Sequence, residues 1–254
     1  MEQVTKGRVH FVINQYPKFG RGPYSIKSPP STVTNSPFYW WFNFLRLNED
    51  YKKTFEANGI GLCTEQYADF GDIYAVDFKE WWLKQGHARL FAEKPSSYTM
   101  KIAKNNSDLA EFNSDEALNV VIPLTWTRTD IERRFAELVL SKIDRANKGV
   151  NTDESTAKYK INGKWHCEAM ATAHKIYLLR HENEQAVKAG TATKLAWADL
   201  AIRAKLNASK GLIEGKKGNV VSDERRTLTV MAIRHYKRAA AYIKAAATNS
   251  FPHL

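Results

Sequence analysis

Four acidic side chains lie close together in the sequence and could bind a divalent cation. They are Asp69, Asp72, Asp77 and Glu80. Carboxylates in such a group can hold a metal ion that activates water for phosphodiester cleavage. However, Asp77 and Glu80 also have the spacing of a helix capping box, and Asp72 follows Gly71 at a predicted turn. We therefore predict no metal site and no cofactor, and a metal-dependent nuclease stays as an alternative.

The seven histidines are scattered along the chain, without a C-x-x-C pair or a metal-binding spacing beside them. His166 or His174, with Lys164 nearby, would suit general acid–base chemistry on RNA. The chain has no Gly-rich phosphate loop after a predicted strand and no G-x-S-x-G turn. The residue pattern thus favours a protein that is not an enzyme.

A third group consists of basic and hydroxyl side chains, which are the types that contact nucleic acid. Arginines pair with guanine edges, and threonines contact phosphate or a thymine methyl group. Most members fall in a helix predicted over residues 222–247, and the others lie in the connection before it, in the preceding helix and in the N-terminal arm. The predicted nucleic-acid-binding residues are Arg225, Arg226, Thr229, Arg234, Lys237, Arg238, Lys216, Lys217, Arg203 and Arg21.

The net charge of +11 is concentrated at the two ends of the chain. Residues 1–36 carry a net +4, residues 37–158 a net −3, and residues 159–254 a net +10, with 17 basic and 7 acidic side chains. Segregated positive charge is typical of proteins that bind polyanions. The alternatives are a basic surface without a ligand, or one that meets an acidic protein.

The elements that position these residues differ between the two ends. Residues 1–36 form a predicted extended arm, because its prolines and glycines prevent a long helix, although residues 9–13 favour a short strand. Such an arm either follows a nucleic-acid groove or wraps around its own domain or a dimer partner. The first long helix is predicted from Ser36, its cap, to Gly59, with an aromatic stripe that we expect in the core.

The middle of the chain mixes helix and strand patterns. A helix is predicted over residues 78–85, with Asp77 as its cap, followed by short extended pieces at 89–91 and 98–102. Residues 118–124 are rich in β-branched side chains and give the strongest strand pattern. An amphipathic helix follows from Thr129, its predicted cap, to Gly149.

Beyond residue 158 the pattern is almost entirely helical, with helices predicted over residues 164–188, 195–206 and 222–247. Small residues on the second of these permit close helix packing, as in a helix-turn-helix pair or in any compact bundle. The connection to the last helix, about fifteen residues, is longer than the turn of a helix-turn-helix motif. In it, residues 212–214 and 219–221 favour either a small basic hairpin or a loop.

These patterns predict an α+β fold that is predominantly helical, with a mixed N-terminal part carrying a few short strands and an all-helical basic C-terminal part. The predicted segments are a basic extended arm (1–36), an aromatic-rich α+β domain (37–149), a linker (150–158) and a basic helical nucleic-acid-binding domain (159–254). The chain has no apolar run long enough to span a bilayer and only two cysteines, which favours a cytoplasmic protein.

The function expected from the sequence is non-enzymatic binding of nucleic acid, with DNA favoured over RNA, by a regulator or accessory factor. Its partners would include the nucleic acid and either a second copy of the chain or a larger nucleoprotein assembly, but no membrane. An RNA-binding component of a ribonucleoprotein, the nuclease considered above and a protein-binding inhibitor of a nucleic-acid machine remain alternatives.

Overall fold

The computed structural model describes residues 11, 13–84, 87–94, 101–112, 117–141, 155–206 and 219–252. Most of these residues are helical, which confirms the predominantly helical fold. The chain divides into two compact units, one formed by Met1–Val12 with Ala92–Thr156 and the other by Ile13–Phe91 with Ala157–Leu254. The second unit therefore combines residues from both sides of the predicted linker, and most of that linker lies outside the described residues.

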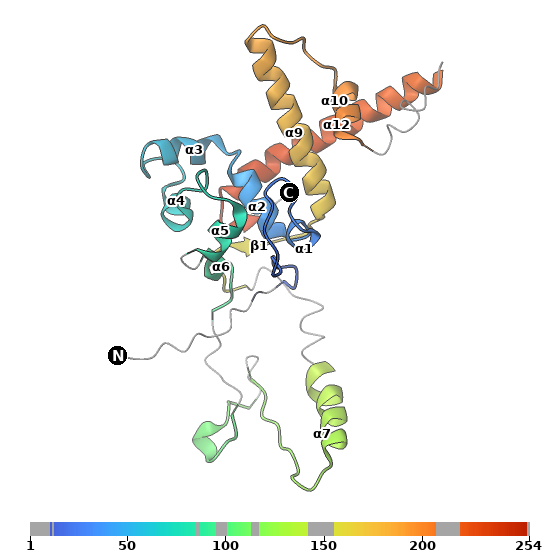
Figure 1. Cartoon of the computed structure of the whole chain (residues 1–254). Coiled ribbons are helices and arrows are strands. Elements are labelled where there is room, and N and C mark those ends of the chain that lie inside the picture. Colours follow the sequence, from blue (N-terminus) through green and yellow to red (C-terminus); the bar gives the residue numbers. More distant parts are fainter. Residues whose placement is uncertain are drawn as a thin grey trace. The chain divides into compact units, whose positions relative to one another are not determined.

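In the second unit, three C-terminal helices pack on one another: α9 (Cys167–Lys188), α10 (Trp197–Ala204) and α12 (Asn219–Ala246). Figure 1 shows α9 crossing α12, with α10 beside both. Their shared core contains Ile176, Ala198, Ala201, Ala204, Leu206, Leu228 and Ala232. The alanines let the backbones approach closely, so the small residues of the sequence serve helix packing here.

An aromatic layer of short helices lies beside the lower ends of α9 and α12 (Figure 1), and its helix α2 contacts both. Its helices are α1 (Ser31–Thr34), α2 (Pro37–Leu45), α3 (Glu49–Glu56), α4 (Thr64–Phe70), α5 (Phe78–Leu83) and α6 (His87–Leu90). The aromatic stripe of α2 is buried as predicted: Trp41 lies 5.1 Å from Phe91 and Phe42 lies 4.9 Å from Trp81 between ring centroids. Burial of such large rings contributes much of the stability of a core.

The C-terminal end of α12 is held by this aromatic layer. The indole N–H of Trp41 donates to the Ala246 carbonyl (2.8 Å), and Asn48 Nδ2 donates to the Ile243 carbonyl (3.0 Å). These carbonyls belong to the last turns of the helix, where intrahelical partners run out. Just beyond, β2 (Ser250–Phe251) pairs in parallel with β1 (Lys160–Ile161).

The single helix predicted from Ser36 to Gly59 is wrong, because two helices, α2 and α3, replace it. The Asn48 side chain accepts a hydrogen bond from the Tyr51 amide (2.9 Å) and so starts a new helix. Asn58, at φ +52°, takes the left-handed position after the end of α3, one residue before the predicted Gly59, which follows at φ +97°. The extended piece predicted at 89–91 is also wrong, since residues up to Leu90 form helix α6.

The strand predicted over residues 118–124 does not form. The backbone is irregular there, and the side chains of Val121 and Leu124 are 92% and 96% exposed. A strand needs a hydrogen-bonded neighbour, and the described part of the chain places none beside this segment. The other predicted strands, at 9–13 and 98–102, lie largely outside the described residues.

The amphipathic helix that follows begins two residues earlier than predicted. In α7 (Arg128–Phe135), Thr127 is the cap and accepts from the Asp130 amide (3.2 Å). The helix continues as the π-helical segment η2 (Ala136–Leu140), and a short 3₁₀ turn, η1 (Asn106–Asp108), lies earlier in the same unit. The remainder of the predicted helix, up to Gly149, lies outside the described residues.

The structure also tests the predicted hairpin before the last helix and the predicted N-terminal arm. Residues 219–221 belong to α12, so they do not form one side of a hairpin, and Ser222 lies inside the helix rather than at its cap. The described part of the N-terminal arm packs on its own unit, because Phe19 contacts Phe78 with ring centroids 5.8 Å apart. The other side of the predicted hairpin, residues 212–214, lies outside the described residues.

Candidate nucleic-acid interface

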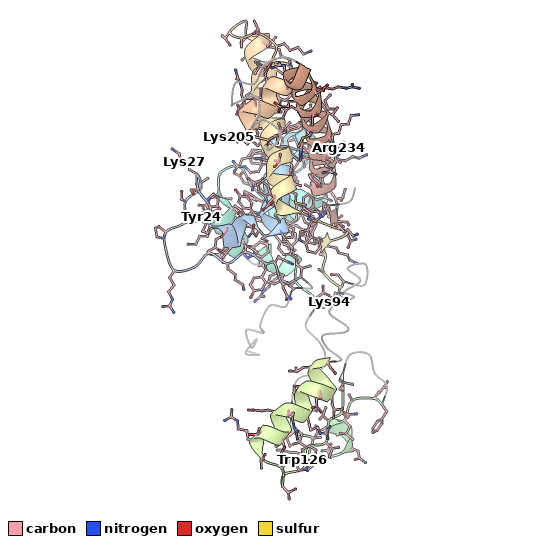
Figure 2. The ribbon with its side chains drawn as sticks, turned by 90° about the vertical axis from the view of Figure 1, so that its right-hand side faces the viewer. Tyr24, Lys27, Lys94, Trp126, Lys205 and Arg234 are labelled. Atoms are coloured by element: carbon pink, nitrogen blue, oxygen red, sulfur yellow. The ribbon has the colours of Figure 1, made fainter. Side chains whose placement is uncertain are left out.

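Helix α12 has one buried face and one exposed basic face. Leu228, Ala239 and Ala246 are fully buried. The exposed cations outside this buried stripe are Arg226, Arg234, Lys237, Arg238 and Lys244, which we call the outer basic face. Figure 2 shows Arg234 on the side of α12 away from α9.

The cations of the outer basic face are regularly placed along the helix. Arg226, Lys237 and Lys244 are separated by 11 and then 7 residues, which brings them onto one line in a helix of 3.6 residues per turn. At about 1.5 Å per residue, this line is roughly 27 Å long. It is therefore long enough to follow several consecutive phosphates.

None of the five side chains of the outer basic face has an ion-pair or hydrogen-bond partner within the described ranges. The exposed acid nearest to them in sequence is Asp223, in the described N-terminal part of α12. Unpaired, solvent-exposed cations create a positive potential that attracts a polyanion. The α7 arginines provide a contrast, because Arg128 pairs with Glu132 at 2.7 Å and Arg133 with Asp130 at 3.0 Å.

Two predicted site residues lie on another flank of α12. Arg225 Nη2 lies 2.8 Å from Asp199 Oδ1, so this arginine joins α12 to α10. Thr229, one turn further on, donates its hydroxyl to the Arg225 carbonyl (2.9 Å). Neither belongs to the outer basic face, because their helical positions point toward α10 rather than away from the core.

The other predicted residues are dispersed. Arg203 is exposed on α10, and Arg21 is exposed on the N-terminal arm. Lys216 and Lys217 lie outside the described residues. Lys244 was not among the ten predicted residues, although its seven-residue spacing from Lys237 is the signal that would have added it.

A row of aromatic side chains between α9, α10 and α12 was not predicted. The ring of Tyr177 lies 5.4 Å from that of Tyr236, with 15° between their planes, and 6.3 Å from that of His181, with 5° between their planes. Trp197 continues the row at 5.2 Å from Tyr236, and the Arg180 guanidinium lies 4.7 Å from the Trp197 ring centroid. Three helices must converge to form it, and sequence spacing within one helix does not reveal such a meeting.

The acidic side chains considered for a metal site have separate structural contacts. Asp69 Oδ2 lies 2.5 Å from Lys158 Nζ and accepts from the Tyr159 hydroxyl at 2.6 Å. Asp72 accepts from the amides of its own turn, and Asp77 accepts from the Glu80 amide at 2.8 Å as the cap of α5. Within the described ranges, no group of three or more potential ligands could hold a metal ion.

His174, considered for acid–base chemistry, lies in the aromatic layer. Its ring is 5.4 Å from Phe44 and 5.8 Å from Trp40 between centroids. Burial, with a smaller contribution from the Arg46 charge, lowers the pKa of His174 from 6.5 to about 4. The imidazole is therefore neutral near pH 7 and packs, half-buried, against the aromatic layer.

The chain matches no known protein-family model, and neither a curated protein nor a solved structure matches it. Among the helices that the structure describes, none is both long enough and apolar enough to cross a membrane. Any function must therefore be argued from the geometry of the surface itself.

Proposed function

We propose that this protein binds nucleic acid without acting as an enzyme, as a DNA-binding regulator or accessory factor. The observation that carries the proposal is the outer basic face of α12, whose five cations have no acidic partner within the described ranges. The proposal includes a cytoplasmic location, supported by the low cysteine content of the chain.

The arrangement of the face suits contacts with a phosphate backbone. Its cations lie along a helix, and lysine and arginine side chains are long enough to adjust to the spacing of phosphates. The helix is held rigidly, because its core face packs on α9 and α10 and its end is bonded to Trp41 and Asn48. A rigid row of cations loses little conformational freedom on binding apart from that of the side chains.

Equilibrium titration with duplex DNA, single-stranded DNA and RNA of equal length tests the proposal. We expect binding whose logarithmic affinity falls steeply with the logarithm of the salt concentration, because counterions are released from the phosphates. Absence of binding to all three at low salt would overturn the proposal. Stronger binding to RNA than to either DNA would assign the face to a ribonucleoprotein.

A second function, binding of a protein partner, is favoured by the unit that contains residues 92–156. Its apolar side chains Leu118, Val120, Val121, Ile122, Leu124 and Trp126 are all at least 44% exposed, and α7 buries none of its residues. Exposed apolar surface of this kind marks interaction sites. Light scattering across protein concentrations tests whether the partner is a second copy of the chain, which would appear as a dimer.

A further inference from the structure

The aromatic row formed by His181, Tyr177, Tyr236 and Trp197 is open to solvent along one side. Tyr177, Tyr236 and Trp197 are half-buried and His181 is exposed. Trp197 and Tyr236 pack with one side against the core shared by α9, α10 and α12. The rings are thus held in place by the core while leaving part of their surface accessible.

The row adjoins the outer basic face. Tyr236 is next in sequence to Lys237, and the exposed Ala240 lies one helical turn after Tyr236 and one turn before Lys244. The small side chain of Ala240 leaves space between the Tyr236 ring and the two lysines. The row and the two lysines therefore lie on adjacent faces of α12.

Two cations beside the row are paired with acids. Arg180 Nε lies 2.6 Å from Glu184 Oε1, and Arg225 pairs with Asp199 at 2.8 Å. The row itself therefore does not attract phosphate, whereas the outer basic face does. This separation of an uncharged aromatic surface from a line of cations is what a single strand requires, since its bases and its backbone lie on different sides.

We infer that the aromatic row stacks unpaired bases while Lys237 and Lys244 contact the phosphates of the same strand. This inference rests on the proposed function and specifies its ligand as nucleic acid with an unpaired region. Every base has a π-face, so the row would bind strands with little sequence preference.

The test compares Tyr236→Leu with Tyr236→Phe, and Tyr177→Leu with Tyr177→Phe, in the full chain. The probes are a single-stranded oligonucleotide and an abasic strand of the same length and charge. We expect each leucine variant to bind the normal strand on the order of ten-fold more weakly than wild type, and each phenylalanine variant to bind it as wild type does. Wild type should bind the abasic strand as weakly as the leucine variants bind the normal one.

The outcomes separate this inference from the proposed function. If wild type binds no nucleic acid, the proposed function fails and the inference fails with it. If wild type binds both strands equally and the leucine variants bind like wild type, the basic face binds nucleic acid but the row does not stack bases. A folded leucine variant is required, so thermal unfolding by circular dichroism accompanies each titration. Preferential binding of a trimethylammonium ligand by the row would also overturn the inference.

Discussion

At the scale of single residues, surroundings decide which chemistry a side chain can perform. His174 was a candidate acid–base group by type, but its position between Trp40 and Phe44 keeps it neutral. Asp77 was correctly predicted as a cap, because its three-residue spacing from Glu80 is a local pattern. The pairing of Asp69 with Lys158 joins residues distant in sequence and could not be predicted in this way.

Burial of His174 predicts a pH dependence of stability. Its pKa is lower in the folded than in the unfolded chain, so its contribution is complete above pH 6.5 and is lost as the pH falls toward 4. We expect wild type to lose about 2 kcal/mol more than His174→Gln between pH 7 and pH 5, measured by urea unfolding. Parallel losses in the two proteins would contradict this assignment.

At the scale of elements, helices with a strong local pattern were predictable and strands were not. Helix α12 follows a 3.6-residue period without glycine or proline in its described turns, so its buried and exposed faces could be derived from the sequence. The strand at 118–124 depends on a neighbouring strand that no local pattern specifies, and it is absent. The break at Asn48 was missed although Asn48 followed by Glu49 and Asp50 is typical of a helix start.

The contact between α2 and α12 yields a prediction about stability. Trp41→Phe keeps an aromatic ring but leaves the Ala246 carbonyl without its indole donor in a buried place. We expect a loss of about 1–3 kcal/mol in the free energy of unfolding, because an unsatisfied buried acceptor is costly. Trp126→Phe, at a side chain 45% exposed in the other unit, is the control and should change stability little.

At the scale of the whole molecule, residues 93–94 and residue 156, far apart in the sequence, lie in contact. Glu93 Oε2 accepts from the Thr156 amide at 2.7 Å, and the Lys94 amide donates to Thr156 Oγ1 at 2.9 Å. The residues that flank 95–154 are therefore neighbours in space. The polar, aperiodic residues 150–158 and the change in charge across them suggested a boundary, but the sequence contained no sign that the first half also contributes to the core around α12.

This geometry predicts that residues 95–154 can be replaced by a short Gly–Ser linker. The loop closed by the linker costs little entropy, since its ends already lie together. We expect the shortened protein to remain helical and to unfold cooperatively, as measured by circular dichroism during heating. An insoluble or non-cooperative product would show that the second unit needs the excised segment.

The most direct test of the proposed nucleic-acid binding is the salt dependence of affinity in two charge-matched variants. One replaces Arg226, Lys237 and Lys244 of the outer basic face with alanine, and the other replaces Arg128, Arg133 and Arg134 of α7, which are exposed and paired with acids. We predict that the first lowers the slope of log affinity against log salt by roughly 2 to 3, as expected for three lost phosphate contacts, while the second keeps the wild-type slope. Equal slopes for the two variants would contradict the account, because binding would then follow net charge rather than this face of α12.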